Sequence, residues 1–136
     1  MAFSFLSGIR VLDLSQYLPG PLAAQVLADL GAEVVKIEPP AGDPQRHLDP
    51  TAGPLDPDVA EGGDTSPFYH VLNAGKTVTR LDLKSDAGRA QFQALVQGAD
   101  VLLESYRPGV MDRLGFGYNA AKDLNPGLIY CALTGY

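Results

Sequence analysis

The first forty residues carry the hydrophobic pattern of a strand, a helix and a second strand. A β-rich run over residues 9–14 is followed by Pro21, and proline favours the first turn of a helix. Apolar residues then recur at helical spacing over residues 22–30, Gly31 marks the end of the helix, and residues 33–37 again favour a strand. Because a strand–helix–strand unit joins parallel strands, this segment predicts the start of a parallel sheet.

Strands and helices continue to alternate through the second half of the chain. The predicted elements are a strand at 77–83, a helix from Ser85 to Gly98 that turns Phe92, Leu95 and Val96 inward, a strand at 101–104, helical pieces at 108–114 and 119–124, and a strand at 128–133. This order predicts an α/β fold with a parallel sheet covered by helices on both faces. Ligands of such folds bind in loops at the carboxyl ends of the strands.

One stretch, from Pro39 to Ser66, interrupts the alternation. It is rich in Pro, Gly and Asp, shows no periodicity and is too long for an ordinary connection. We interpret it as a loop over a site. Its composition buries little apolar surface to offset the entropy of ordering, so we expect it to be the least ordered internal segment.

Composition limits the classes of function. A length of 136 residues fits one domain, and a net charge of −6 offers no general attraction for nucleic acid or anionic lipid. The start of the chain lacks the basic flank of a signal peptide, and no apolar run reaches 18 residues, so we expect a soluble cytoplasmic protein without a membrane partner. Cys131 is the single cysteine, which excludes a cysteine metal cluster within one chain; its apolar surroundings predict a buried thiol.

The loop over residues 15–21 is a candidate binding site for a polar or anionic group. It lies between the first strand and a helix N-terminus, where free N–H groups and the helix dipole favour negative charge. A turn that merely redirects the chain remains an equal alternative. The glycines of a dinucleotide fingerprint are missing although Glu38 stands where a ribose-binding acid would be, and no phosphate-binding P-loop is present.

Two further segments carry candidate cations. Lys76 precedes a predicted strand, which would place its amine on the rim of the site, although most lysines are simply solvated. Past the strand at 101–104, Arg107 and Arg113 can hold phosphates while Tyr106 stacks on a base. Alternatively, Arg113 forms a solvated ion pair with Asp112 or Glu104, and the sequence leaves both interpretations open.

An ordered series of short motifs resembles the N-terminal part of the class III CoA-transferases, the carnitine-dehydratase and bile-acid-inducible protein family. The matching segments are residues 8–14, 19–21, 27–38, 73–76, 81–84, 99–104, 107–110, 125–126 and 133–136. Each segment is unspecific, but nine in this order span almost the whole chain. The resemblance implies a Rossmann-like large domain of which residues 1–136 form the N-terminal CoA-binding part, an interlocked homodimer, and coenzyme A as ligand with no metal.

The same resemblance implies which residues touch the nucleotide. Carried over one at a time, the family's contacts match Tyr17 and Leu18 in the first loop, Lys76, the strand-end residues Ser105, Tyr106 and Arg107, and the later Arg113. One departure is Pro39, which stands where some relatives carry a basic residue. Arg46 or Lys36 can compensate for that lost contact.

The implied activity is CoA transfer between an acyl-CoA thioester and a carboxylic acid. In the family an aspartate attacks the thioester to give a mixed anhydride, which is nucleophilic catalysis by a carboxylate. That aspartate follows the region around Gly135, so no residue here matches it, and the second, smaller domain and C-terminal segment are expected to be absent. Two alternatives remain open: a 2-methylacyl-CoA racemase of the same family, and a non-catalytic CoA-binding or dimerisation remnant.

Overall fold

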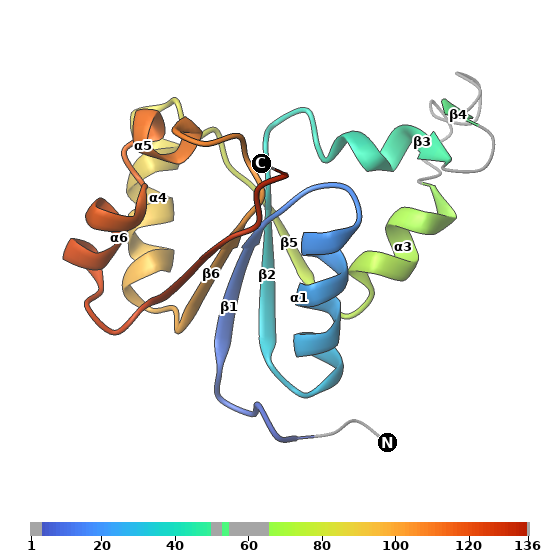
Figure 1. Cartoon of the computed structure of the whole chain (residues 1–136), viewed down its shortest axis with the longest axis horizontal. Helices are drawn as coiled ribbons and strands as arrows, with labels where there is room; N and C mark the ends of the chain where they lie inside the picture. The colour runs from blue at the N-terminus through green and yellow to red at the C-terminus, as the bar shows by residue number, and fades with distance from the viewer. Residues whose placement is uncertain (1–3, 50–52, 55–65, 136) are drawn as a thin grey trace.

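A five-stranded, entirely parallel sheet forms the centre of the molecule (Figure 1). The computed structural model describes residues 4–49, 53–54 and 66–135. The strands are β1 (Arg10–Leu14), β2 (Glu33–Glu38), β5 (Thr77–Arg80), β6 (Val101–Glu104) and β7 (Ile129–Ala132), in the spatial order β5-β2-β1-β6-β7. The chain therefore builds outward from β1 in one direction and then in the other, as in doubly wound nucleotide-binding folds.

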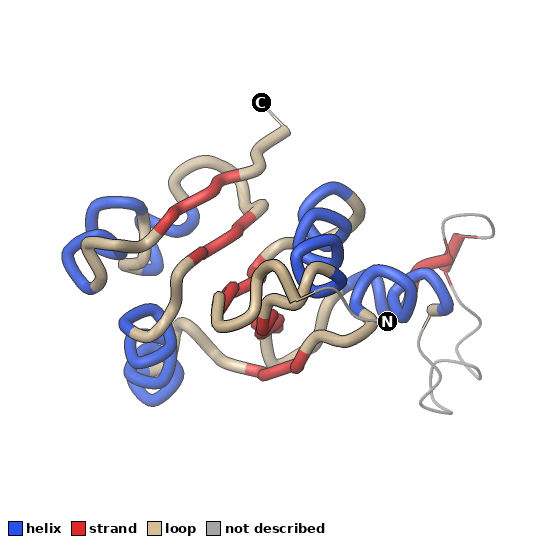
Figure 2. Tube along the Cα trace, turned by 90° about the horizontal axis from the view of Figure 1, so that it is seen from below, coloured by secondary structure: helices blue, strands red, loops and turns tan. Residues whose placement is uncertain are grey.

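Helices cover both faces of this sheet, which confirms the predicted fold class. On one side lie α1 (Pro19–Asp29) and α3 (Pro67–Asn73), and on the other lie α4 (Asp86–Gln97), α5 (Val110–Leu114) and α6 (Tyr118–Leu124) (Figures 1 and 2). None of the helices in the described ranges has the length and apolar character needed to cross a membrane.

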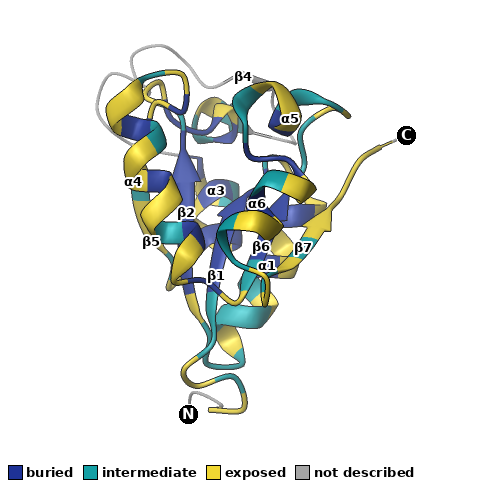
Figure 3. Ribbon diagram, turned by 90° about the vertical axis from the view of Figure 1, so that its left-hand side faces the viewer, coloured by how far each residue is buried: buried dark blue, intermediate teal, exposed yellow. Residues whose placement is uncertain are grey.

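The central strands are largely buried (Figure 3), and alternation of their side chains divides the core into two clusters. The larger cluster, on the α4 side, includes Leu12, Leu102, Phe92 and Phe116, with the two rings in edge-to-face contact. The smaller cluster packs α1 against the other face through Val11, Ala24, Val34 and Leu103. On this second face, the positions of β1 and β2 nearer the carboxyl ends are occupied by buried charged residues instead of apolar ones.

The predicted signals at the ends of the helices are confirmed. The Ser85 hydroxyl accepts a hydrogen bond from the Gly88 N–H and so caps α4, and Gly98 follows its last residue. Gly31 ends the α1 turn with φ of +100°, a left-handed conformation that favours glycine. Within α4, Phe92 and Val96 are fully buried and Leu95 packs against the same cluster.

Several element boundaries differ from the expectation. β5 ends at Arg80, although the apolar alternation continues, because Leu81 and Leu83 leave the sheet and pack into the α4-side core. Helix α3 was not predicted at all. Its seven residues follow the Pro-rich stretch directly, and Tyr69 and Leu72 alone give too short an amphipathic pattern to stand out.

The first part of the 39–66 stretch forms regular secondary structure. It contains the 3₁₀ helix η1 (Pro44–His47), followed by β3 (Leu48–Asp49), which pairs antiparallel with β4 (Gly53–Pro54). Asp43 caps η1 and is buried, as is Gln45. Polar interactions rather than apolar burial hold residues 43–47, and composition alone does not indicate them. The comparison of order with the rest of the chain stays a prediction. Residues 50–52 and 55–65, on which the rest of the prediction falls, lie outside the described residues.

Cys131 corrects a second expectation, because it is exposed rather than buried. It lies on β7, the edge strand, where Ile129 is also 64% exposed. In register, these residues neighbour Val101 and Leu103, so they belong to the α1 face of the sheet. The apolar run marked a strand correctly, but α1 packs over β1 and β2 and leaves β7 open.

Gly88 offers a test of how α4 docks onto the preceding turn. A Cβ at this position would lie 2.1 Å from the Asp82 carbonyl oxygen, a backbone atom that cannot move aside locally. We therefore expect Gly88→Ala to lower the free energy of unfolding by about 1–3 kcal/mol, against the usual preference for alanine in helices.

Gly98→Ala is the matched control for this substitution. Its added Cβ would meet nothing closer than 3.5 Å, so we expect a stabilising change of no more than about 1 kcal/mol. Chemical denaturation of the two variants measures both values. Equal effects would show that the approach of α4 to residue 82 does not constrain the fold.

Candidate functional site

A cavity opens where the carboxyl ends of the central strands meet. Its volume is about 230 Å³. The walls come from the first loop, the end of β2 and the residues after it, the segments after β5 and β6, and both ends of α5. The lining residues are Gln16, Ile37, Glu38, Pro39, Pro40, Leu81, Asp82, Leu83, Lys84, Tyr106, Val110 and Leu114. The loops after β1 and β6 flank the point where the strand order reverses, which is the usual ligand position in open α/β sheets.

A second, more open cavity of about 370 Å³ adjoins the first. It is lined by Ser105, Tyr106, Arg107, Pro108 and Gly135, so Tyr106 contributes to both. Burial raises the pKa of the Tyr106 hydroxyl, which therefore stays neutral at physiological pH. Because Tyr106 lines both, we refer to the two cavities together as the crevice.

The first loop is held in place from two neighbouring elements. The Asp13 carboxylate accepts hydrogen bonds from the N–H and the hydroxyl of Ser15, and the Ser105 hydroxyl accepts one from the Gln16 N–H at 2.8 Å. Tyr17 then adopts φ of +65°, which is uncommon outside glycine, and its side chain is 56% exposed. Gly20 allows the tight return, because a Cβ there would lie 2.2 Å from the Ser15 Cβ.

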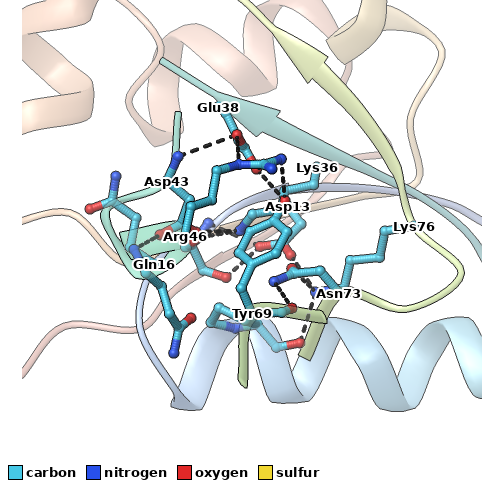
Figure 4. Close-up of polar contacts among 12 residues, drawn as sticks. Asp13, Gln16, Lys36, Glu38, Asp43, Arg46, Tyr69, Asn73 and Lys76 are labelled. Atoms are coloured by element: carbon cyan, nitrogen blue, oxygen red, sulfur yellow. Dashed lines mark hydrogen bonds and ion pairs between the residues drawn. The ribbon is translucent and has the colours of Figure 1, made fainter. Parts of the chain in front are cut away.

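Lys76 lies inside the protein, not on the rim. Its side chain is fully buried, and its ammonium group donates to Asp13 Oδ2 at 2.9 Å, to the Pro21 carbonyl at 2.9 Å and to Asn73 Oδ1 at 3.0 Å (Figure 4). Burial lowers the pKa of Lys76, and the adjacent Asp13 carboxylate opposes this shift. All three ammonium hydrogens are therefore used within the chain. The position of Lys76 just before a strand suggested that its amine lies on the rim of the site. Instead, the side chain extends toward Asp13 and the Pro21 carbonyl, at the two ends of the first loop.

Two further buried ion pairs lie beside Lys76 and Asp13. The Lys36 amine is 2.8 Å from Asp43 Oδ2, and both side chains are 1% exposed. The Glu38 carboxylate accepts two hydrogen bonds from Arg46 and one from the Tyr69 hydroxyl (Figure 4). Burial alone would raise the pKa of Glu38, but these bonds and the Arg46 charge outweigh it and lower the pKa. Burial and the Glu38 carboxylate raise the pKa of Tyr69.

These pairs answer the question raised by Pro39. Arg46 or Lys36 was considered as a replacement for the missing basic residue, but the structure engages both within the chain. Lys36 is buried against Asp43, and Arg46 holds Glu38 while its guanidinium lies 4.1 Å from the centre of the Tyr69 ring. Neither is available at the crevice without breaking an ion pair.

The ten Lys and Arg side chains divide into those that have partners within the described part of the chain and those that do not. Of the ten Lys and Arg side chains, seven make ion pairs, hydrogen bonds or ring contacts within the chain: Arg10, Lys36, Arg46, Lys76, Arg80, Arg89 and Lys122. Within residues 4–49, 53–54 and 66–135, the other three, Lys84, Arg107 and Arg113, make none. Lys84 and Arg107 line the cavities, and Arg113 lies on α5, whose Val110 and Leu114 line the first cavity.

Arg113 does not form the ion pair considered as its alternative. The described part of the chain shows no contact of its guanidinium with Asp112 or Glu104. Burial raises the pKa of Glu104, opposed by hydrogen bonds from the Tyr106 N–H and the Tyr130 hydroxyl. The same ranges contain no group of three or more His, Cys, Asp or Glu side chains placed to hold a metal ion.

The structure brings together some of the predicted site residues and separates others. Tyr106 lines both cavities, and Ser105 and Arg107 line the second. Tyr17 and Leu18 are about half exposed next to the cavity residue Gln16, and neither lines a cavity. Gln16 lies in the candidate loop 15–21 but was not named as a ligand contact, and Leu83 and Lys84 were not assigned to the site. Residues 81–84 were a signal, because they form one of the family motifs, but otherwise only a strand over 77–83 was predicted there.

Comparisons with known proteins agree with the sequence resemblance. The chain matches the model of CoA-transferase family III over residues 6–136. It is 43% identical to the acetyl-CoA:oxalate CoA-transferase of Acetobacter aceti, over 95% of this chain and 31% of that protein. It is 42% identical to the succinate–glutarate CoA-transferase of Agrobacterium fabrum, over 96% of this chain and 32% of that protein.

A solved structure supports the same conclusion for the fold. A CAIB/BAIF family protein from Brucella suis superposes with a TM-score of 0.85 and 38% identity, over 96% of this chain and 33% of that one. The chain thus spans about a third of the length of the relatives it matches.

The burial of Lys76 generates a prediction about stability. Lys76→Met keeps the approximate shape of the side chain but leaves Asp13 as an unpaired buried charge. We expect the free energy of unfolding to fall by about 3–5 kcal/mol. Adding Asp13→Asn should recover part of the loss, because the unpaired charge is then gone.

Lys84→Met is the matched control, since Lys84 is exposed and makes no ion pair within the described ranges. It should change the stability by less than about 0.5 kcal/mol. Urea denaturation distinguishes the variants. A Lys76→Met protein as stable as the parent would mean that the amine is not held by Asp13 and is free to serve a ligand.

Proposed function

Because the chain belongs to CoA-transferase family III, we propose that its crevice binds the nucleotide end of a CoA thioester. We further propose that the chain supplies this part of an enzyme that transfers CoA from an acyl-CoA to a carboxylic acid. The first cavity is smaller than the roughly 300–1,000 Å³ of pockets that enclose whole ligands. It therefore suits one end of a long ligand such as CoA, with the remainder extending along the crevice.

The observation that carries the proposal is the location of the three cations without partners. The chain has a net charge of −6, so an anionic ligand must be held by local groups. Within the described ranges, the side chains of Lys84, Arg107 and Arg113 make no ion pair, hydrogen bond or ring contact. Lys84 and Arg107 line the crevice, and Arg113 lies on α5, whose Val110 and Leu114 line it. CoA carries a diphosphate and a 3′-phosphate, which are suited to guanidinium and ammonium groups placed in this way.

The other site residues receive roles from their surroundings. Tyr106 offers its ring to a base, because it is half-buried and its side chain lines both cavities. Tyr17 and Leu18 extend the first loop beside Gln16 and are proposed as contacts to the ligand. Ser105 supports that loop through its hydroxyl, in addition to lining the second cavity.

A direct contact between Lys76 and a CoA phosphate would need a change in the hydrogen bonds of its amine. A direct contact with phosphate requires its amine to give up one of three protein acceptors in a buried position. Its support of Asp13, and through Asp13 of Ser15, needs no such change. We therefore favour support of the first loop as the contribution of Lys76 to CoA binding.

The chemistry proposed for the whole enzyme is carboxylate nucleophilic catalysis. An aspartate attacks the thioester carbonyl, the carbon–sulfur bond breaks, and CoA leaves as a thiolate to give a mixed anhydride. The thiolate then attacks the aspartyl carbonyl of the anhydride, which releases the donor carboxylate and leaves an aspartyl-CoA thioester. The acceptor carboxylate attacks this thioester and displaces the thiolate to give a second mixed anhydride. The thiolate finally attacks the acceptor acyl carbon, which forms the new acyl-CoA and restores the aspartate. No residue of this chain matches the family's nucleophile, so the crevice residues bind and orient but take no covalent step. An interlocked homodimer in the cytoplasm remains part of the proposal.

The transferase is favoured over the two alternatives. The relatives described above carry the names of CoA-transferases, whereas no observation favours a racemase. A non-catalytic CoA-binding remnant shares the same crevice and differs only in turnover. The substrates oxalate, succinate and glutarate are stated for those relatives, and we propose only an acyl-CoA donor and a carboxylic acid acceptor here.

The three-cation arrangement predicts the outcome of single substitutions. Arg107→Ala and Arg113→Ala should each weaken CoA binding by roughly ten- to a hundredfold, the equivalent of one charge-assisted hydrogen bond of about 1.5–3 kcal/mol. Folding should be almost unchanged, because neither guanidinium is paired. Calorimetry with CoA and dephospho-CoA assigns the phosphates: the penalty disappears with dephospho-CoA for a side chain on the 3′-phosphate and persists for one on the diphosphate.

Lys122→Ala is the control for the loss of one positive charge. Lys122 lies on α6 with its amine 5.8 Å from the centre of the Tyr118 ring, and it lines neither cavity. It should leave CoA affinity unchanged. If the arginine variants bind CoA as tightly as the parent, the crevice does not hold the phosphates.

Turnover tests the proposed division between binding and catalysis. We expect the 136-residue chain to bind CoA but not to exchange CoA between succinyl-CoA and a panel of carboxylates, because it has no matching nucleophile. A chain extended to the length of its relatives should be active. Chromatographic detection of new acyl-CoA species with the short chain alone would contradict the mechanism.

A further inference from the structure

Lys36 is a buried lysine with two partners from different parts of the chain. It lies on β2, is 1% exposed, and its amine is 2.8 Å from Asp43 Oδ2. The same amine donates a hydrogen bond to the Ser15 carbonyl at 3.0 Å. Asp43 belongs to the connection between β2 and η1, and Ser15 to the loop between β1 and α1 (Figure 4). One ammonium group thus joins two loops that leave neighbouring strands.

Both loops form walls of the first cavity. Gln16, next to Ser15, lines it from one side, and Glu38, Pro39 and Pro40 line it from the other. The Asp43 N–H also donates to Glu38 Oε2 at 3.2 Å, so the second wall is continuous with the Lys36 ion pair. Neither Lys36 nor Asp43 lines either of the two cavities described above. The ion pair therefore lies behind these walls and not among the lining residues.

We propose that Lys36, paired with Asp43, is a positioning residue that fixes the distance between the two walls of the crevice. The proposal rests on the function proposed above, because it concerns the ligand of the same crevice. The physical argument for the proposal is that a lysine, and not an apolar residue, occupies position 36. Val34, two positions earlier on the same face of β2, fills its place with apolar packing. An apolar side chain at position 36 could pack in the same way, but only a donor can bind the Ser15 carbonyl.

Energetics also favour a positioning role over simple stabilisation. Removing two charges from water is costly, and replacing a buried ion pair by apolar groups is often neutral or stabilising. What the ion pair contributes instead is a fixed position of the two loops, since the Lys36 amine must lie within reach of both Asp43 and the Ser15 carbonyl. The Ser15 and Gln16 N–H groups are fixed in the same loop by Asp13 and Ser105, so loss of the Lys36 contact should loosen a loop that is otherwise well defined.

A pair of variants separates positioning from stability. Lys36→Met removes the donor and leaves Asp43 unpaired, so both stability and wall geometry should suffer. Lys36→Met combined with Asp43→Asn removes both charges, while the amide oxygen introduced at position 43 can still accept from the Gln45 N–H. We expect the double variant to regain stability relative to the single one. We also expect it to keep the loosened first loop, because the Ser15 carbonyl still lacks its donor.

The control is Val34→Ala, which removes buried packing from the same strand and face without touching either wall. Two measurements are made on the parent and all three variants of the full 136-residue chain. Amide hydrogen exchange at residues 15 and 16 should be about tenfold faster, or more, in both Lys36 variants and unchanged in Val34→Ala. CoA affinity, measured by calorimetry, should fall by about tenfold or more in the same two variants only.

The outcomes keep the two proposals apart. If the parent does not bind CoA, the proposed function fails, and exchange at residues 15 and 16 alone decides whether Lys36 positions the loop. Unchanged exchange in both Lys36 variants overturns the inference. So does a double variant that regains CoA affinity together with stability, because the ion pair would then act only through folding.

Discussion

The pairing of buried charge beneath the first loop is the constraint on which the site depends. Asp13, Asp43, Lys36 and Lys76 are each almost fully buried and form the pairs Lys76–Asp13 and Lys36–Asp43. An unpaired charge in such a place costs several kcal/mol, so each group confines its partner. Through these pairs β1 is tied to the segment before β5, and β2 to the segment before η1. The loops that form the crevice walls are thereby attached to the sheet at points that no ligand needs to contact.

The same constraint determines where positive charge is left over. Most of the ten cations contact carboxylates, carbonyls or rings within the chain. These include Lys36 and Arg46, the two alternatives considered as a replacement for the basic residue missing at Pro39. In the described part of the chain, Lys84, Arg107 and Arg113 remain unpaired; the first two line the crevice, and Arg113 lies on α5, which contributes to its wall. An acidic protein can therefore present a local site for an anionic ligand, because structural pairing uses the other cations elsewhere.

Some features followed from short-range patterns alone. The hydrophobic periodicity and the end signals at Gly31, Ser85 and Gly98 located α1, α4 and the parallel strands, since these depend on neighbouring residues and on backbone sterics. The exposure of Cys131 could not be read in this way. An apolar run predicts a strand, whereas burial depends on whether a helix from another part of the chain packs over it, and α1 does not reach β7.

The sequence by itself determined the α/β order, the carboxyl edge of the sheet as the place for a ligand, and membership of a family through nine ordered motifs. It placed Tyr106 and Arg107 at a strand end, where the structure also finds them. Only the tertiary structure decided which cations are used internally. Lys76 and Arg107 both stand in the sequence as cations near strand ends, yet one is enclosed by Asp13, Asn73 and Pro21 and the other faces a cavity. The reason is physical: the partners of Lys76 lie 63, 3 and 55 positions away along the chain, and distances in sequence do not reveal which acceptors folding brings together.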